Sequence, residues 1–215
     1  MGCEYSGRVR NAFRERGFDA WSCDLLPADD GSPYHITGDV LDIVRQDWDL
    51  GIFHPPCTYM CNSGVTWLYK GVNENGERIL NKQRWAKLGQ AASFLFLLWG
   101  SGIKHIAIEN PIMHKYAKAL LPGLPQPQII QPWMFGHTEK KATCLWLKNL
   151  PELVPVTNLK EETDALPKRE QQRLHYLPPS KERWKLRSTT FQGIADAMAD
   201  QWGRYLMNDG GAHVG

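Results

Sequence analysis

The stretch Leu50-Gly51-Ile52-Phe53-His54-Pro55-Pro56-Cys57 decides the fold. A short apolar run that stops at two prolines is typical of a buried strand with an abrupt end. In an open α/β sheet, ligands bind at the carboxyl ends of the strands. The thiol of Cys57 follows such an end, so Cys57 is the first candidate nucleophile.

A second apolar run ends in an acid. Ile106-Ala107-Ile108 is followed by Glu109-Asn110-Pro111. Because the carboxyl ends of parallel strands meet at one edge of a sheet, this run delivers a carboxyl group in the same manner. We therefore expect the thiol of Cys57 and the carboxyl group of Glu109 to face one substrate.

Helix-like and strand-like segments alternate along the chain. Apolar side chains recur at helical spacing in residues 7–16, 84–99 and 193–207. Short strand-like runs end at Asp24 or surround Asp39, and another covers residues 142–147. This alternation predicts an α/β fold, an open doubly wound Rossmann-like sheet with right-handed crossovers and a small insert.

Length and composition favour one domain with a small appendage. The chain has 215 residues, of which 42% are hydrophobic, enough to bury one good core. We expect a core in residues 1–150, a basic insert in 151–188, a helix returning to the core in 189–207 and a disordered tail in 208–215.

The cellular setting follows from what the sequence lacks. No window approaches the roughly 20 apolar residues that a membrane span needs, and no leader opens the chain. Five cysteines argue against a disulfide framework and suit a reducing compartment. We expect a protein of the cytoplasm, in a bacterial or phage-infected cell, with Cys57 unpaired and no membrane partner.

Basic side chains cluster locally although the net charge is only +2. Residues 168–187 carry seven basic and two acidic side chains with aromatic rings between them, which favours contact with phosphates. Residues 58–80 read as a long loop and a candidate lid, with Trp67 placed to grip DNA.

The order of these motifs resembles the cytosine carbon-5 DNA methyltransferases, particularly the short phage and prophage members, over most of the chain. Cys3-Glu4-Tyr5-Ser6-Gly7 is similar to the first cofactor loop of that family. Pro55-Pro56-Cys57 resembles its nucleophile motif, and Glu109-Asn110-Pro111 its glutamate motif. The segment 190–195 resembles the final helix that returns to the cofactor pocket.

The resemblance implies an S-adenosyl-L-methionine-dependent enzyme that methylates carbon 5 of a cytosine flipped out of double-stranded DNA. Cys57 would be the nucleophile, with Glu109 assisting at ring nitrogen 3 if enclosure raises its pKa. The implied cofactor-binding residues are Glu4, Tyr5, Ser6, Gly7, Asp24, Asp39 and Pro55. The implied base or DNA contacts are Pro56, Trp67, Asn110, Lys140, Lys141, Thr143, Arg183, Lys185 and Arg187.

Several positions depart from the family pattern. Pro111 stands where valine is usual, Thr58 where glutamine is common, and Lys140-Lys141-Ala142-Thr143 where an Arg-x-Arg is expected. Met1-Gly2 directly precedes the cofactor loop, so we also expect the usual apolar first strand to be absent.

Each motif also has a purely structural interpretation. Cys57 would then be an inert buried thiol and Glu109 a solvated strand end. Asp24 and Asp39 would be helix caps or turn residues. His54, Cys57 and Cys61 do not have zinc-site spacing, so no metal is expected.

Two other functions remain open. An exocyclic-amino DNA methyltransferase also places a Pro-Pro motif at this strand end, but follows it with an aromatic ring where this chain has Cys57. The second is a non-catalytic DNA- or nucleotide-binding protein derived from the same fold.

Overall fold

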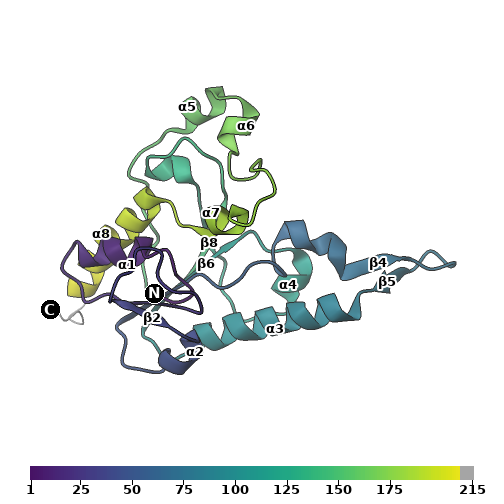
Figure 1. Cartoon of the computed structure of the whole chain (residues 1–215), viewed down its shortest axis with the longest axis horizontal. Coiled ribbons are helices and arrows are strands. Elements are labelled where there is room, and N and C mark those ends of the chain that lie inside the picture. Colours follow the sequence, from purple (N-terminus) through teal and green to yellow (C-terminus); the bar gives the residue numbers. More distant parts are fainter. Residues whose placement is uncertain (209–215) are drawn as a thin grey trace.

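The computed structural model describes residues 1–208, and a mixed β-sheet forms its centre (Figure 1). Strands β3 (Leu50–Phe53) and β6 (His105–Pro111) lie side by side in parallel. Strand β8 (Thr143–Lys148) runs antiparallel to β6, and β7 (Gln128–Ile130) pairs with the other side of β8. The parallel pairing brings the carboxyl ends of β3 and β6 to one edge of the sheet, as the sequence predicts.

The first residues of the chain belong to the sheet. Strands β1 (Ser22–Asp24) and β2 (His35–Thr37) pair in parallel, and Gly2 bridges Cys23 of β1 and Phe53 of β3. The N–H of Gly2 donates to the β3 backbone at 2.8 Å, and its C=O accepts from the next residue along at 3.0 Å. The strand order is therefore β2-β1-Gly2-β3-β6-β8-β7.

The usual first strand is absent from the described residues, as the sequence predicts. No strand precedes α1, and Gly2 alone forms isolated bridges between β1 and β3.

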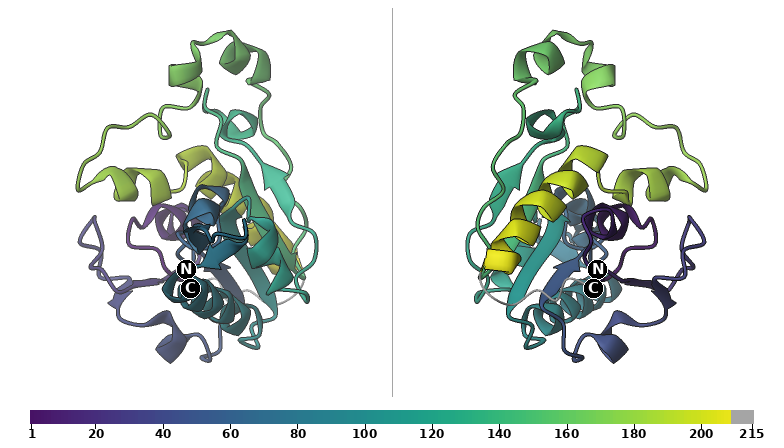
Figure 2. Two further views of the ribbon diagram at one scale, coloured as in Figure 1. Left: turned by 90° about the vertical axis from the view of Figure 1, so that its right-hand side faces the viewer. Right: turned by 90° about the vertical axis from the view of Figure 1, so that its left-hand side faces the viewer.

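Helices cover both faces of the sheet, which confirms the predicted α/β class. Helices α1 (Arg8–Arg14) and α8 (Gln192–Asn208) pack together on one face, and Figure 2 shows α8 lying across it. Helix α3 (Lys82–Trp99) packs on the other face. Successive residues of a strand point to opposite faces, so β3 sends Ile52 toward α1 and α8, and Phe53 toward α3.

Residues 58–80 are not the loop that the sequence analysis expected. They form a 3₁₀ helix, η1 (Asn62–Leu68), and an antiparallel hairpin of β4 (Tyr69–Val72) and β5 (Arg78–Leu80). Figure 1 shows this hairpin projecting far from the sheet, beyond the end of α3. The expectation of a lid over the site is wrong for this conformation, because the hairpin points outward.

Short helices complete the structure. They are α2 (Val40–Ile43), α4 (Lys115–Ala119), η2 (Pro132–Phe135), α5 (Lys160–Ala165), α6 (Lys168–Gln171) and α7 (Arg183–Ser188). The predicted insert, 151–188, contains α5, α6 and α7, of which α5 and α6 lie away from the sheet in Figure 1. Of the predicted tail, Asn208 ends α8, and the rest lies outside the described residues. Within residues 1–208, no helix is both long and apolar enough to cross a membrane.

Candidate active site at the carboxyl ends of β3 and β6

A tight turn follows β3 and presents Cys57. Pro55 is buried and Pro56 is exposed. The carbonyl oxygen of Cys57 accepts hydrogen bonds from the backbone N–H groups of Met60 and Cys61, both at 3.0 Å. These bonds form one helical turn, which places residues 57 and 61 on the same side.

Asn110 ties the two strand ends together. Its side chain is buried, and Nδ2 donates to the carbonyl oxygen of Pro55 at 3.1 Å. Its Oδ1 has no hydrogen-bond partner within residues 1–208. Asn110, predicted to contact the base, thus holds the Pro55-Pro56-Cys57 turn against β6 in this structure.

Cys57 and Cys61 form a thiol pair. The thiol of Cys57 donates toward Cys61, and this contact, together with burial, raises the pKa of Cys57. The same contact, the Ser63 hydroxyl 3.1 Å away and two backbone N–H groups lower the pKa of Cys61 to about 5. The contact therefore favours the proton on Cys57 and the negative charge on Cys61. Sequence reasoning missed Cys61 as a partner, although its spacing of four residues from Cys57 was a visible signal.

Glu109 is enclosed but ionised. Its Oε2 lies 3.0 Å from Nδ1 of His54 and accepts a hydrogen bond from the Thr190 hydroxyl at 3.1 Å. Burial alone would raise the pKa of Glu109, but His54, the charge of Lys141 and the Thr190 hydroxyl together lower it to about 2. The condition set for Glu109, a pKa raised by enclosure, is not met, because a basic side chain is enclosed with the acid.

His54 is the partner that sequence reasoning missed at this position. Both His54 and Glu109 expose 11% of their side chains. Burial would lower the pKa of His54, but Glu109 outweighs it and raises the pKa. The two atoms are not aligned for a hydrogen bond, so the contact is an ion pair. The His54 Nε2 atom has no hydrogen-bond partner within the part of the chain that the structure describes.

Lys141 acts electrostatically on the residues that follow both strands. Its positive charge helps to lower the pKa of Glu109 and partly offsets the rise in the pKa of Cys57. Its Nζ lies 5.7 Å from the ring centre of Phe191, directly before α8. The parallel pairing of β3 and β6 brings their ends to one edge of the sheet, and that Cys57 and Glu109 face one substrate stays a prediction.

Lys140 and Thr143 have structural partners instead. Lys140 Nζ binds Asp164 at 2.5 Å and Gln171 at 2.6 Å, which attaches the segment before β8 to the insert. Thr143 is buried, and its hydroxyl donates to the carbonyl of Lys141 at 3.2 Å.

The predicted cofactor loop lies at the start of α1. Gly7 adopts a left-handed conformation with φ of +68°, and an added Cβ would lie 2.2 Å from the Arg10 side chain, so glycine is required. Glu4 is buried, and its carboxylate accepts hydrogen bonds from the N–H groups of Val9 at 2.6 Å and Arg10 at 3.3 Å. The Glu4 side chain therefore caps α1.

Tyr5 and Ser6 occupy different settings in the same loop. Tyr5 is buried, with its ring 5.7 Å from that of Trp184 and its hydroxyl 3.4 Å from the hydroxyl of Ser188, so α7 covers it. The Ser6 hydroxyl accepts from the N–H of Arg8 at 3.5 Å.

Asp24 and Asp39 lie near each other beside Cys3. Burial, followed by the charges of both carboxylates among its neighbours, raises the pKa of Cys3 to about 12. The Asp24 carboxylate accepts from the N–H of Leu26 at 3.0 Å, and Asp39 caps α2 through Leu41 at 2.9 Å. Both acids make the turn and cap bonds of the structural interpretation, and their cofactor role stays a prediction.

The predicted DNA contacts are dispersed. Trp67 is 65% exposed on η1, so it does not pack back onto the body. On α7, Arg183 donates to the carbonyl of His175 at 3.0 Å, Lys185 lies 3.7 Å from Asp29, and Arg187 is exposed. Of these residues, those of α7 lie beside the predicted cofactor loop, because Trp184 of α7 contacts the ring of Tyr5. Within residues 1–208, no group of three or more histidine, cysteine or acidic side chains is arranged to hold a metal ion.

Comparisons with known proteins give little further guidance. No protein family model and no curated protein matches the sequence. A solved structure from E. coli, provisionally described as a DNA modification methyltransferase encoded within a prophage, is similar with a TM-score of 0.43 and 17% identity. The similarity covers 78% of this chain and 54% of that chain, so this chain spans about half the length of that protein.

Proposed function

We propose that this chain is an S-adenosyl-L-methionine-dependent DNA methyltransferase that modifies carbon 5 of a flipped cytosine through a transient Cys57 adduct. One observation carries the proposal. Cys57 and Glu109 follow neighbouring parallel strands, and the charge of Lys141 acts on both side chains. At the carboxyl edge of an open sheet, a nucleophile can attack a flat ring while an ionised acid accepts hydrogen bonds from the same ring.

The proposed reaction begins at the thiol. The sulfur of Cys57 forms a bond to carbon 6 of cytosine, its proton passes to the neighbouring Cys61 thiolate, and the electrons of the ring double bond move to carbon 5. Bound S-adenosyl-L-methionine supplies the methyl group that carbon 5 attacks. Transfer of the carbon-5 proton to a water molecule then restores the ring double bond and breaks the bond between sulfur and carbon 6. Cys57 leaves as a thiolate and takes back the proton that Cys61 accepted.

Glu109 is suited to hold the ring during this sequence. As a carboxylate it accepts hydrogen bonds, so it would take one from the exocyclic amino group or from a protonated ring nitrogen 3. His54 and Thr190 position it. The unpaired Oδ1 of Asn110 and Nε2 of His54 lie in the same strand ends and offer further polar contacts.

The residues around β1 and β2, on the side of Gly2 away from β3, fit the cofactor. Carboxylates at the ends of parallel strands accept hydrogen bonds from ribose hydroxyls in dinucleotide-binding folds, and Asp24 ends β1 in this way. Asp39 lies at the start of α2 nearby, where its carboxylate is suited to the adenine amino group. The left-handed turn at Gly7 allows the backbone of the loop to approach the methionine end.

DNA is the proposed partner because carbon 5 of cytosine is inaccessible inside a stacked duplex, so the base must be extruded. The basic side chains of α6 and α7 would contact the phosphates. Helix α7 lies against Tyr5 of the cofactor loop, which brings basic residues close to the proposed pocket.

The decisive experiment is trapping on duplex DNA that contains 5-fluorocytosine, with S-adenosyl-L-methionine present. Fluorine cannot leave as the proton does, so the adduct should persist and appear as a slower band in a denaturing gel. We expect the band with the natural chain and with Cys144→Ala, a control at a buried cysteine of the sheet. We expect no band with Cys57→Ser.

Two results would favour the other functions. Methylation of cytosine-containing DNA that survives Cys57→Ser would indicate transfer to an exocyclic amino group. Calorimetric titration of a folded sample with S-adenosylhomocysteine that shows no heat of binding would favour a non-catalytic protein.

A further inference from the structure

The backbone sets the distance between the two cysteines of the thiol pair. The carbonyl oxygen of Cys57 accepts a hydrogen bond from the N–H of Cys61 at 3.0 Å, which closes one helical turn. In such a turn, Cα atoms four residues apart lie about 6 Å from each other. A disulfide joins cysteines whose Cα atoms lie roughly 4.4–6.8 Å apart, so these two thiols have the separation that a covalent bond between them requires.

The two side chains also point toward each other. The thiol of Cys57 donates toward the sulfur of Cys61, and both side chains are half-buried. Cysteines whose Cβ atoms point apart cannot be joined without movement of the backbone, and this obstacle does not arise here.

Three elements hold the turn of the thiol pair in place. Nη2 of Arg84 on α3 donates to the carbonyl oxygen of Thr58 at 2.9 Å. The N–H of His114, which caps α4, donates to the carbonyl oxygen of Met60 at 3.0 Å. On η1, an added Cβ at Gly64 would lie 2.7 Å from the Thr58 oxygen, so glycine allows η1 to pack against the turn. The contact between the two sulfurs is therefore part of the fold.

Cys61 is the sulfur of the pair that is suited to react first. Its Sγ lies 3.1 Å from the Ser63 hydroxyl, and the backbone N–H groups of Ser63 and Gly64 also donate toward it. These donors and the thiol of Cys57 stabilise a thiolate and lower the pKa of Cys61 to about 5. The thiolate is the form of cysteine that peroxides oxidise.

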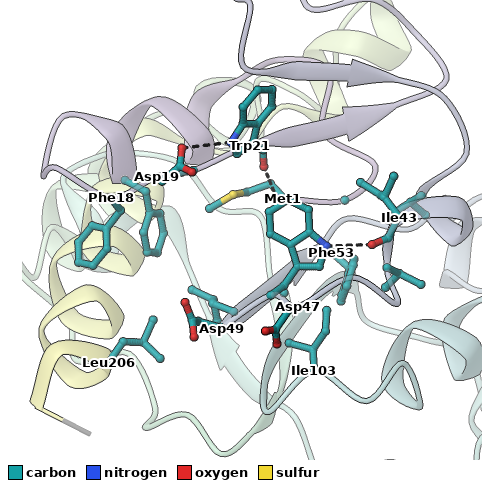
Figure 3. Close-up of a pocket in the computed structure, with 18 residues that line it drawn as sticks. Met1, Phe18, Asp19, Trp21, Ile43, Asp47, Asp49, Phe53, Ile103 and Leu206 are labelled. Carbon is teal, nitrogen blue, oxygen red and sulfur yellow. Dashed lines mark hydrogen bonds between the residues drawn. The ribbon is translucent and has the colours of Figure 1, made fainter. Parts of the chain in front are cut away.

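The other three cysteines have surroundings that oppose oxidation. Cys23 and Cys144 are buried, and this burial raises the pKa of both. Burial, followed by nearby carboxylates, raises the pKa of Cys3 to about 12. A cavity of about 270 Å³ opens beside Met1 (Figure 3), but none of the described residues that line it is a cysteine. An oxidant should therefore act first at the thiol pair.

We propose that Cys57 and Cys61 form a peroxide-sensitive site, in which a hydroperoxide converts the thiol pair into a reversible disulfide. In the disulfide, the sulfur of Cys57 has no electron pair to offer to a base, so oxidation would stop the proposed methyl transfer. Only this last consequence rests on the function proposed above.

The oxidation proceeds in two steps. The Cys61 thiolate attacks one oxygen of the hydroperoxide, the bond between the two oxygens breaks, and the other oxygen leaves as hydroxide or alkoxide. The sulfur of Cys57 then bonds to the sulfur of the Cys61 sulfenic acid, and the sulfenic hydroxyl takes the Cys57 proton and leaves as water. One electron pair passes from the sulfurs to the peroxide.

Lys141 favours the second step. The sulfenic acid is uncharged, so oxidation removes the negative neighbour that raises the pKa of Cys57. The positive charge of Lys141 continues to lower that pKa, which favours loss of the Cys57 proton as the disulfide forms.

The test is peptide mapping of the full chain after reduction with dithiothreitol, removal of the reductant and treatment with a small molar excess of hydrogen peroxide. Trypsin releases both cysteines in one peptide, residues 46–70, which contains no other cysteine. We expect this peptide to become lighter by a pair of hydrogen atoms and to stop reacting with iodoacetamide. Dithiothreitol should reverse both changes.

Two variants test the order of the steps. In Cys57→Ser, the sulfenic acid at Cys61 has no partner, so dimedone, which reacts with sulfenic acids, should label residue 61. In Cys144→Ala, which changes a buried cysteine, the disulfide should form as in the natural chain. Unchanged iodoacetamide labelling of peptide 46–70 after peroxide, or disulfide-linked dimers in place of the internal bond, would overturn the proposal.

Trapping on DNA that contains 5-fluorocytosine separates this proposal from the proposed function. The oxidised chain should lose the adduct, and dithiothreitol should restore it. A disulfide in a chain that forms no adduct even when reduced would support the peroxide-sensitive site and refute the proposed reaction. An adduct with the reduced chain, but no disulfide after peroxide, would refute the peroxide-sensitive site alone.

Discussion

His54 Nδ1 lies 3.0 Å from Glu109 Oε2, and the two side chains leave the ends of adjacent parallel strands. A buried charge that loses its partner typically costs about 3 to 5 kcal/mol. We therefore expect His54→Leu to lower the free energy of unfolding by about 3 kcal/mol, measured by urea denaturation. In the double variant with Glu109→Gln most of that loss should return, and a loss that stays undiminished would show that the pair is not the cause.

The same pair predicts a pH dependence. The pKa of Glu109 is lowered from 4.5 to about 2, so its contribution is present above pH 4.5 and is lost as the pH falls toward 2. The pKa of His54 is raised from 6.5, so its contribution is complete below pH 6.5 and is lost as the pH rises through the higher value. The pair should stabilise the fold most between pH 4.5 and 6.5. Melting temperatures of the natural chain and of His54→Gln should differ most in that range, and a constant difference from pH 3 to 9 would contradict the ion pair.

The thiol pair predicts unequal reactivity. With a pKa of about 5, Cys61 should react with iodoacetamide at a nearly constant rate above pH 6, while Cys57 should react slowly. In Cys61→Ala, Cys57 loses its negative neighbour and keeps the nearby charge of Lys141, so it should react at a lower pH than before. Mass spectrometry of labelled peptides between pH 5 and 10 measures both rates. Faster labelling of Cys57 than of Cys61 in the natural chain would show that Cys57 has the lower pKa of the two thiols.

Lys140 and Lys141 are neighbours with different surroundings. Lys141→Met removes the charge that acts on Cys57 and Glu109, so the pKa of both should rise, and formation of the 5-fluorocytosine adduct should slow by about tenfold or more. Lys140→Met removes contacts to Asp164 and Gln171 in the insert and should leave that rate nearly unchanged. Equal effects of the two variants would refute the electrostatic role of Lys141.

Loss of the Glu4 carboxylate should affect stability rather than catalysis, because this carboxylate caps α1. Glu4→Ala leaves the N–H groups of Val9 and Arg10 without their acceptor, which should lower the free energy of unfolding by about 1 to 2 kcal/mol. Ser6→Ala removes only a 3.5 Å contact and should cost less than about 0.5 kcal/mol. Urea denaturation of both variants measures these losses. Equal losses in the free energy of unfolding for Glu4→Ala and Ser6→Ala would contradict the capping role of Glu4.

Binding to DNA should depend on salt through particular arginines. Arg187 is exposed on α7, so Arg187→Ala should reduce the slope of log affinity against log salt by about one for duplex DNA. Arg173→Ala is the control, because the Arg173 guanidinium lies 2.7 Å from the Glu139 carboxylate. Fluorescence anisotropy with a labelled duplex at several salt concentrations measures both slopes. An unchanged slope for Arg187→Ala would remove this residue from the interface.

The sequence predicted the elements of the site better than its electrostatics. The positions of Cys57 and Glu109 follow from local signals, an apolar run and the residues that end it, and parallel pairing then brings the two ends together. The lowered pKa of Glu109 depends first on His54, then on Lys141, and last on Thr190, which is 81 residues away in the chain. Local patterns carry no information about such contacts, so they did not reveal that the pKa of Glu109 is lowered.

The hairpin of β4 and β5 shows a signal that was present but not used. Asn75-Gly76 is a typical turn for two antiparallel strands, and Gly76 has a φ of +79°. The many polar residues around it suggested a loop instead. The place of β8 between β6 and β7, by contrast, has no local signal, because it depends on which of several strands pair.

That placement affects the order in which the protein can fold during synthesis. Strand β7 pairs with β8 among the described strands, and α1 packs against α8, which lies far along the chain from it. A nascent chain must therefore carry an uncovered apolar surface on α1 until α8 has been synthesised. We infer that stalling of the ribosome before α8 leaves a species prone to aggregation, on which chaperones would act.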